Sequence, residues 1–322
     1  MDSIKFSDGK LIILDQRKLP FKKKYLKCKN EFETANAIKN MAVRGAPAIG
    51  IAGAYGIALS KNPKSASIIL KKSRPTAVDL FNAIDFMLEG IKEGGEKISL
   101  AKKWHSLIIQ KTKKISENGA SLIKNNSNIL LHCNAGPIAT AGHGTSLGAV
   151  IMAKKMGTHI FVYVDETRPR FQGALTSFEL MEAKIPHKII IDSSAGFFMN
   201  SGKIDSVMVG ADRIAKNGDF ANKIGTYSLA VLAKENKIPF FVFAPISTFD
   251  FSIDSGRKIK IEERNENEIL EIYRKRVYGK GAKAINPAFD ITPAKYVSAY
   301  ITEYGIFKNT KGIERRWKNT LE

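Results

Sequence analysis

Cysteine is scarce in this chain, whose 322 residues include only Cys28 and Cys133. Two cysteines are too few to indicate a disulfide framework. The chain also lacks an uninterrupted apolar run of roughly 18 residues, so no transmembrane helix is predicted. Its first residues, MDSIKFSDGK, have neither the basic region nor the apolar region of a secretory signal. We therefore expect a cytoplasmic protein that does not associate with membranes.

Several cofactor motifs are missing as well. No G-x-x-x-x-G-K-[ST] loop is present, which disfavours a nucleoside triphosphatase. Gly142, Gly144 and Gly148 do not have the spacing of a dinucleotide-binding fingerprint. The five histidines form no H-x-x-x-H pattern and the cysteines form no C-x-x-C pattern, so a metal site is not indicated.

Acidic residues are few relative to basic ones: 31 Asp and Glu stand against 51 Lys and Arg, a formal net charge of +20. The lysines lie in small scattered groups and are not interleaved with aromatic residues, as they are on a base-stacking surface. We interpret the excess as a solvated, lysine-rich surface, with the attraction of an anion towards an active site as the alternative, and the pattern disfavours a nucleic-acid partner.

The spacing of apolar residues changes near residue 125. In residues 3–28, apolar runs flank Asp8-Gly9, which predicts a β hairpin. The next part of the chain is mainly helical in pattern, and after residue 125 short apolar runs alternate with helical patterns, which is typical of a parallel sheet covered on both faces. We therefore predict an α/β protein: a small, mainly helical N-terminal domain with a β hairpin (residues 1–122), then a Rossmann-like domain with a mostly parallel sheet (residues 123–322).

Polar residues follow four of the predicted strands. In such a sheet, ligands bind beyond the carboxyl ends of the strands. The four strand ends are Cys133-Asn134, Asp165 to Arg168, Asp192 to Ser194, and Gly210 to Arg213. The sequence therefore predicts a functional site at this edge of the sheet.

Cys133 and Asp212 are the candidate reactive groups at this edge. A thiolate at Cys133 needs a helix N-terminus or a nearby cation to stabilise it. Because Asp212 directly follows an apolar strand, we expect it to be buried, to hold its proton and to act as a general acid. His132 precedes Cys133 on a strand, where successive side chains point to opposite faces, so we do not expect a Cys–His pair.

Other residues are candidates for binding an anion. Arg44 lies on a Gly/Pro turn in "VRGAPAIG", and Arg74 precedes a predicted helix. Asn222-Lys223 lies ahead of another helix start, and Gln172 follows the polar run after a predicted strand. Together these residues supply the positive pocket that a sugar phosphate needs.

Long stretches of the chain have a recognisable pattern. They include "MAVRGAPAIG", "HCNAGPIATAGHGTSLGAV", "VYVDETRPRFQGALTSFEL", "VGADRIAKNGDFANKIGTYSLAVLAKENKIPFFVFAP", "IEERN" and "NPAFDITPAKYVSAYITEYGI". These stretches closely resemble the methylthioribose-1-phosphate isomerase family, which shares a superfamily with regulatory subunits of the translation-initiation nucleotide exchange factor. The resemblance runs from near residue 2 to near residue 307.

The resemblance implies conversion of 5-methylthioribose 1-phosphate to 5-methylthioribulose 1-phosphate in methionine salvage, without a metal or an organic cofactor, by a homodimer. It places the catalytic cysteine on Cys133 and the catalytic aspartate on Asp212. It also implies a set of phosphate- and sugar-binding positions: Arg44, Gly45, Ala46, Arg74, Gln172, Asn222 and Lys223.

Three alternatives stay open. Moving hydrogen from C2 to C1 needs either a base, for which the Cys133 thiolate is the candidate, or a hydride shift in a dry pocket. Pro137-Ile138 and "DSSAGFFM" depart from the usual family sequence, so 5-deoxyribose 1-phosphate and ribose 1,5-bisphosphate remain alternative substrates. A translation-factor-like regulatory binding protein is the alternative of a different class, and the joint presence of Cys133, Asp212 and Arg44 favours an enzyme.

Overall fold

The computed structural model describes residues 2–75 and 77–318, and the chain forms two compact units. One comprises the chain up to Ser116 together with Ala135–Ala149, and the other comprises Glu117–Asn134 together with the chain from Val150 onward. The segment Ala135–Ala149 thus belongs with the first unit. The two units therefore cannot be separated by a single boundary in the sequence. The division between residues 122 and 123 stays a prediction of domain organisation.

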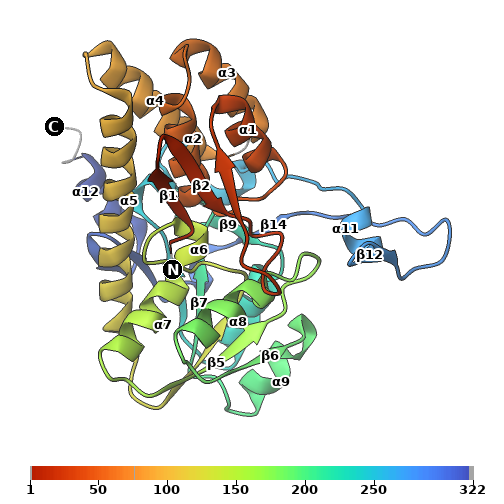
Figure 1. The fold of residues 1–322 in the computed structure, drawn as a ribbon. Coiled ribbons are helices and arrows are strands. Elements are labelled where there is room, and N and C mark those ends of the chain that lie inside the picture. Colours follow the sequence, from red (N-terminus) through yellow and green to blue (C-terminus); the bar gives the residue numbers. More distant parts are fainter. Residues whose placement is uncertain (1, 76, 319–322) are drawn as a thin grey trace. The chain divides into compact units, whose positions relative to one another are not determined.

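The first unit combines a small sheet with helices (Figure 1). Its antiparallel strands are β1 (Ile4–Ser7), β2 (Lys10–Leu14) and β3 (Tyr25–Cys28). Asp8 and Gly9 both have positive φ, as a tight hairpin turn requires, so the predicted hairpin is confirmed. The helices are α1 (Glu31–Lys39), α2 (Ala46–Ala58), α3 (Pro63–Ser73), α4 (Val78–Lys92) and α6 (Pro137–Thr140).

Helices α5 (Lys97–Ala120) and α7 (Ser146–Lys155) contribute residues to both units. Asn118-Gly119 is a sequence signal for the end of a helix, and α5 continues one residue past it to Ala120. No helix among the described residues is long and apolar enough to cross a membrane.

The second unit is built on a seven-stranded sheet with the order β16-β15-β10-β7-β4-β5-β6. The five strands predicted from apolar runs are all present, and all of them pair in parallel. They are β4 (Ser127–Leu131), β5 (Ile160–Asp165), β6 (His187–Ile190), β7 (Ser206–Gly210) and β10 (Phe240–Phe243). Strand β15 (Ala299–Thr302) extends the sheet in parallel, and β16 (Gly305–Phe307) completes it in antiparallel pairing.

The strand order places a switch point between β4 and β7. From β4 the chain runs outward through β5 to β6 on one side, and then through β7 to β10 on the other. In open α/β sheets, ligands bind beyond the carboxyl ends of the strands at such a point. Cys133 follows β4 and Asp212 follows β7, so these two residues lie at the ends of the strands that flank the switch point.

Helices of the second unit bury the apolar faces of the sheet. They are α8 (Gln172–Glu182), α9 (Ala195–Asn200), α10 (Thr226–Glu235) and α12 (Thr310–Lys318), whereas the short α11 (Asn267–Leu270) lies apart from the sheet (Figure 1). Met199 of α9 and Leu229 of α10 belong to one buried cluster with Val207 and Val242 of the sheet. Burial of this kind is the main favourable contribution to folding, and it fixes the strand ends that follow.

A second, four-stranded sheet has the order β11-β8-β9-β14. Its strands are β8 (Arg213–Ala215), β9 (Phe220–Lys223), β11 (Phe249–Asp250) and β14 (Phe289–Thr292), and a separate hairpin pairs β12 (Glu271–Ile272) with β13 (Lys275–Arg276). Asn222 and Lys223 therefore lie in a buried strand, whereas the sequence predicted only a segment ahead of a helix. The partner strand β14 is distant in the sequence, so the local pattern does not reveal this pairing.

Candidate functional site

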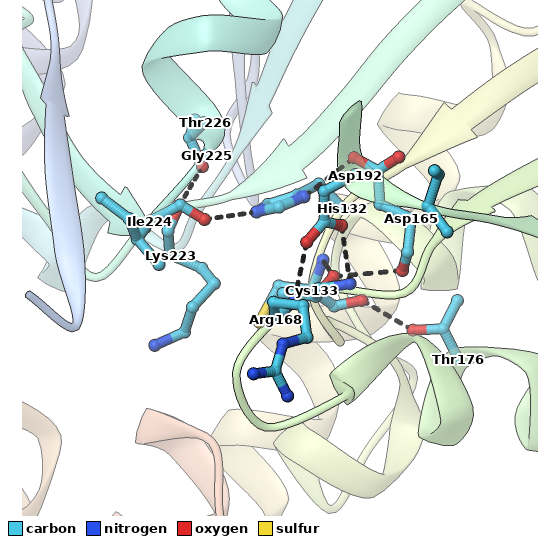
Figure 2. Close-up of polar contacts among 12 residues, drawn as sticks. His132, Cys133, Asp165, Arg168, Thr176, Asp192, Lys223, Ile224, Gly225 and Thr226 are labelled. Carbon is cyan, nitrogen blue, oxygen red and sulfur yellow. Dashed lines mark hydrogen bonds and ion pairs between the residues drawn. The ribbon is translucent and has the colours of Figure 1, made fainter. Parts of the chain in front are cut away.

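Cys133 lies just beyond β4 with its backbone in the left-handed region, at φ +65°. Two threonine hydroxyls hold its peptide groups. The Cys133 N–H donates to Thr167 Oγ1 at 2.9 Å, and Thr176 Oγ1 donates to the Cys133 carbonyl at 2.7 Å (Figure 2). The cysteine is thus fixed between the turn after β5 and helix α8, and its side chain is half-buried.

His132 is directed away from Cys133 and forms a buried pair with Asp165 (Figure 2). Its Nδ1 lies 2.9 Å from Asp165 Oδ2, and its Nε2 lies 2.9 Å from the Ile224 carbonyl oxygen. A carbonyl oxygen only accepts hydrogen bonds, so Nε2 carries a proton and the second proton lies between Nδ1 and the carboxyl group. Both ring nitrogens are therefore engaged, which agrees with the prediction that His132 and Cys133 do not form a Cys–His pair.

The electrostatic surroundings of this pair favour retention of the shared proton. Burial alone would lower the pKa of His132, but the hydrogen bond and charge of Asp165, with the further charge of Asp192, outweigh it and raise that pKa. The same three side chains form a cluster whose ligand atoms lie within 4.8 Å of one another. Asp192 is also engaged, since its carboxylate accepts the backbone N–H groups of Thr167 and Arg168 at 2.8 and 2.7 Å. This arrangement fits a structural hydrogen-bond network better than a metal site.

Lys223 is the buried cation of the site, with 6% of its surface exposed. Its Nζ donates to the Ala288 carbonyl at 2.8 Å and lies 4.4 Å from the centre of the Phe289 ring. Burial lowers the pKa of Lys223, while charges at Cys133 and Asp212 act to raise it. The ammonium group is therefore within electrostatic range of both candidate reactive groups.

Two arginines add positive charge beside Lys223. Arg264 and Arg170 both act to lower the pKa of Lys223, which is the effect of like charges close by. The Arg264 guanidinium also lies over the Phe289 ring, 5.7 Å from its centre, and Arg170 pairs with Glu268. Lys223, Arg264 and Arg170 form a group of cations suited to bind a phosphate dianion.

The burial predicted for Asp212 is wrong, because its side chain is exposed. Strand β7 ends two residues earlier at Gly210 and β8 begins at Arg213, so Asp212 lies in the short connection between two strands. Its backbone is nevertheless held, since its N–H donates to the Ala221 carbonyl of β9 at 2.9 Å. Arg213, the next residue in the chain, pairs with Asp250 at 3.4 Å.

Gln172 and Asn222 lie in the same unit as Cys133. Gln172 is the first residue of α8 and is 9% exposed, and its buried Oε1 has no hydrogen-bond partner among the described residues. Asn222 is buried in β9, and its Nδ2 donates to Thr226 Oγ1 at 3.0 Å. The unpartnered oxygen of Gln172 is the kind of acceptor that a sugar hydroxyl requires.

The other predicted positions lie in the first unit. Arg44, Gly45 and Ala46 form the start of α2, and Arg74 is the residue at the end of α3. Gly45 has φ +96°, and a Cβ atom there would lie 2.0 Å from the Ala139 carbonyl oxygen, so only glycine fits. The roles of these four residues in binding a substrate stay predictions.

Sequence reasoning missed three residues that the structure places around Cys133 and Lys223. They are Thr176, Arg264 and Arg170. Thr176 lies four residues after Gln172, on the same face of α8, and this spacing is a signal that was available. Arg264 lies within the quoted "IEERN" stretch, but its proximity to Lys223 depends on the long-range pairing of β9 with β14.

Comparisons with known proteins show the family to which the chain belongs. The model of the initiation factor 2 subunit family matches residues 42–309. The methylthioribose-1-phosphate isomerase of Caldicellulosiruptor saccharolyticus is 51% identical over 95% of this chain and 96% of its own length. The structure of 5-methylthioribose 1-phosphate isomerase from Pyrococcus horikoshii is 38% identical with a TM-score of 0.91, covering 98% of this chain and 96% of that one.

A second solved structure is described as translation initiation factor eIF-2B, subunit delta, from A. fulgidus. It is 40% identical with a TM-score of 0.90, and the match covers 98% of this chain and 99% of that one. The fold is thus common to proteins described as isomerases and as translation factors. On these matches, the chain belongs to the initiation factor 2 subunit family and, within it, to the methylthioribose-1-phosphate isomerases.

Proposed function

We propose that this protein isomerises 5-methylthioribose 1-phosphate to 5-methylthioribulose 1-phosphate, a step of methionine salvage. The observation that carries the proposal is the position of Cys133 at the switch point of the sheet, within electrostatic range of the buried Lys223. The identity of about half of all residues with proteins described as this isomerase supports the same substrate.

The cations of the site have a defined task in this reaction. The substrate phosphate is an anion, and Lys223, Arg264 and Arg170 present a group of positive charges beside Cys133 and Asp212. Part of the same charge stabilises the thiolate of Cys133 relative to the thiol. The same side chains thus bind the substrate phosphate and stabilise the Cys133 thiolate.

Ring opening comes first in the proposed mechanism. The anomeric oxygen of the substrate carries phosphate, so the ring does not open as a free hemiacetal does. Asp212 donates a proton to the ring oxygen as the bond from that oxygen to C1 breaks, which leaves a hydroxyl on C4 and positive charge at C1. Because Asp212 is exposed in the free protein, the bound substrate has to exclude water from it, and this desolvation is what keeps the carboxyl group protonated for the transfer.

Hydrogen then moves from C2 to C1 by one of two routes. In the first, the Cys133 thiolate removes the proton from C2, which leaves an enol, and returns it to C1 as the C2 hydroxyl loses its proton to a base of the site and becomes the ketone. In the second, a hydride passes directly from C2 to C1, and the C2 hydroxyl loses its proton to a base of the site. Substrate deuterated at C2 separates the routes: complete retention at C1 indicates the hydride shift, and exchange with solvent indicates the thiolate base.

The experiment that tests the substrate compares three sugar phosphates by NMR. We expect turnover of 5-methylthioribose 1-phosphate with a kcat/KM at least about tenfold above those of 5-deoxyribose 1-phosphate and ribose 1,5-bisphosphate, since one apolar group is worth about 1–3 kcal/mol. A higher kcat/KM with either analogue would identify that analogue as the substrate and leave the proposed isomerisation unchanged. Absence of turnover with all three would contradict the proposed function.

A translation-factor-like binding protein is kept as the second candidate because of the 40% identity to the A. fulgidus protein. This function requires a binding partner and no chemistry at Cys133. The homodimer and the cytoplasmic location also stay predictions, and the sedimentation behaviour of the purified protein tests the first of them.

A further inference from the structure

Cys133 has an unusual backbone conformation for a residue with a side chain. Its φ of +65° lies in the left-handed region, which costs a non-glycine residue about 1–3 kcal/mol and persists only where surrounding contacts impose it. We propose that Thr176 and Thr167 are positioning residues, which hold Cys133 in this conformation so that its thiol is correctly placed for the reaction. The proposal rests on the catalytic role given to Cys133 above.

The hydroxyl of Thr167 has only one arrangement that satisfies its neighbours. The N–H of Cys133 must be the donor in its contact with Thr167 Oγ1, at 2.9 Å. The hydroxyl proton is therefore available for the Asp165 carbonyl, 3.1 Å away. Thr167 itself is fully buried, and its own N–H donates to Asp192. The turn after β5 thus fixes one side of the Cys133 peptide.

The hydroxyl of Thr176 is fixed in the same way on the other side. Asn134 Nδ2 donates to Thr176 Oγ1 at 3.1 Å, and an amide nitrogen cannot accept, so the hydroxyl proton is directed to the Cys133 carbonyl. Glu179 accepts a second bond from Asn134 Nδ2 at 2.6 Å. Helix α8 therefore holds both Cys133 and the residue that follows it.

These contacts constrain the direction of the cysteine side chain. The peptide groups on both sides of Cys133 are each tied to a buried hydroxyl, so φ and ψ are fixed from two independent elements. The direction of a Cα–Cβ bond follows from the backbone, and small errors in placing a reacting group cost large factors in rate. Without either hydroxyl, Cys133 is free to relax to a right-handed or extended conformation, which turns its thiol away.

The test uses Thr176→Val, which keeps the shape and removes the hydroxyl, and Thr176→Ser, which keeps the hydroxyl. We expect Thr176→Val to lower kcat at least about tenfold with a change in KM below about threefold, because positioning affects the reacting step more than binding. Thr176→Ser should retain most of the wild-type kcat. Thr167→Ser is the second conservative variant, and it should behave likewise.

Thr292→Val is the matched control. Thr292 is also fully buried in the second unit, but its hydroxyl has no hydrogen-bond partner among the described residues. The same change of Thr to Val should therefore leave kcat within about twofold of wild type, since no hydrogen bond is lost. A thermal melt of each variant shows whether the fold is retained.

Alkylation of Cys133 by iodoacetamide is a second readout that does not depend on turnover. The other cysteine, Cys28, is buried, and burial raises its pKa to about 11, so the thiol stays protonated and reacts slowly. Mass spectrometry of the labelled peptides separates the two. We expect Thr176→Val to slow the labelling of Cys133 at neutral pH, because the thiol moves away from the charge of Lys223.

The outcomes distinguish this proposal from the function it rests on. Retention of kcat within about twofold by Thr176→Val, or equal impairment of Thr176→Ser and Thr176→Val, overturns the positioning role. If Cys133→Ser keeps full activity, the catalytic role of the cysteine fails, and the labelling rates alone then decide whether Thr176 positions Cys133. Loss of activity in Thr176→Val with slow labelling, rescued by serine, supports the proposal.

Discussion

At the scale of single residues, Lys223 combines an energetic cost with a functional role. The burial of a charged ammonium group carries a desolvation penalty, which is reflected in the lowered pKa of Lys223. Its hydrogen bond to the Ala288 carbonyl and its position over Phe289 offset part of that penalty. A buried charge that destabilises the fold is expected at a functional site, where it serves binding or catalysis.

Replacement of Lys223 by methionine should therefore change activity and stability in different directions. We expect kcat/KM to fall about 100-fold or more, because the phosphate and the thiolate both lose a cation. The free energy of unfolding at pH 7 should be unchanged or larger, since the apolar side chain removes the desolvation penalty. Steady-state kinetics and urea unfolding measure the two effects.

Lys295→Met is the control for this comparison. Lys295 also lies over an aromatic ring, that of Tyr296, but it is exposed and belongs to no part of the proposed site. Its replacement should leave both activity and stability close to wild type. A large loss of stability in Lys223→Met with unchanged kinetics would show that the lysine is structural.

The His132–Asp165 pair predicts a dependence of stability on pH. The folded pKa of His132 is raised above 6.5, so the folded state binds a proton more tightly than the unfolded state does. This contribution to stability is fully present below pH 6.5 and is lost as the pH rises through the raised pKa. We expect the free energy of unfolding to fall as the pH rises above 6.5 and through the raised pKa of His132.

His132→Gln should flatten this dependence, because glutamine does not titrate. Urea unfolding at several pH values measures it, and His159→Gln, at an exposed position, should keep the wild-type slope. An identical slope in His132→Gln and wild type would mean that the buried pair does not retain the proton.

The residue scale also shows what the sequence can predict about a site. Cys133 and Asp212 could both be placed at strand ends, because apolar runs mark where buried strands stop. The exposure of Asp212 could not be inferred in the same way, since it depends on which distant segments pack around the connection after β7. The two hydroxyls that hold Cys133 come from other elements, and only the folded chain shows them.

At the scale of elements, helix α8 is packed unusually close to the end of β5. A Cβ atom at Gly173 would lie 2.2 Å from the Asp165 carbonyl oxygen, which is too close for any side chain. The third residue after Gly173 is Thr176, so the close approach of the helix also sets the position of the hydroxyl that bonds to Cys133. A small residue at one position thus supports the site through the packing of a whole helix.

Gly173→Ala should therefore displace α8 and affect both stability and rate. Overpacking of this kind typically costs about 1–3 kcal/mol, and we expect a matching loss in the free energy of unfolding, with a lower kcat. Gly196→Ala is the control, because Gly196 is also the second residue of its helix but would place its Cβ 3.3 Å from a flexible leucine side chain. Equal stability of the two variants would contradict the close packing of α8.

The elements differ in how well the sequence predicts them. The parallel strands β4, β5, β6, β7 and β10 are continuous apolar runs, so their pattern is local and readily recognised. Strand β9 is short and pairs with β14, which is so distant in the chain that the hydrogen bond from Lys223 to Ala288 spans 65 residues. The sequence alone therefore did not show that Asn222 and Lys223 lie in a strand, because β9 forms only by pairing with this distant partner.

At the scale of the whole molecule, the net charge of +20 is the main property that the proposed chemistry does not require. A lysine-rich surface attracts anions of every kind, including nucleic acids, but such non-specific attraction is screened by salt. The cations around Cys133 act at short range and within a partly buried site, where screening is weaker.

Salt should therefore separate surface charge from function. Between about 0.05 and about 0.3 M salt, we expect any binding of a random RNA to weaken by a factor of about 100 or more, whereas kcat/KM falls by less than about tenfold. Filter binding and the isomerase assay measure the two quantities in the same buffers. RNA binding that persists at the higher salt, with sequence preference, would favour the translation-factor-like function.

The most direct test of the central claim is the rate of ketose formation from 5-methylthioribose 1-phosphate, followed by NMR for wild type, Cys133→Ser and Asp212→Asn. We predict turnover by wild type and a loss of at least about 1000-fold in kcat for each variant, because each change removes a group that acts on the reacting atoms. Wild-type rates in either variant, or an inactive wild type, would contradict the assignment of Cys133 and Asp212 as the catalytic pair.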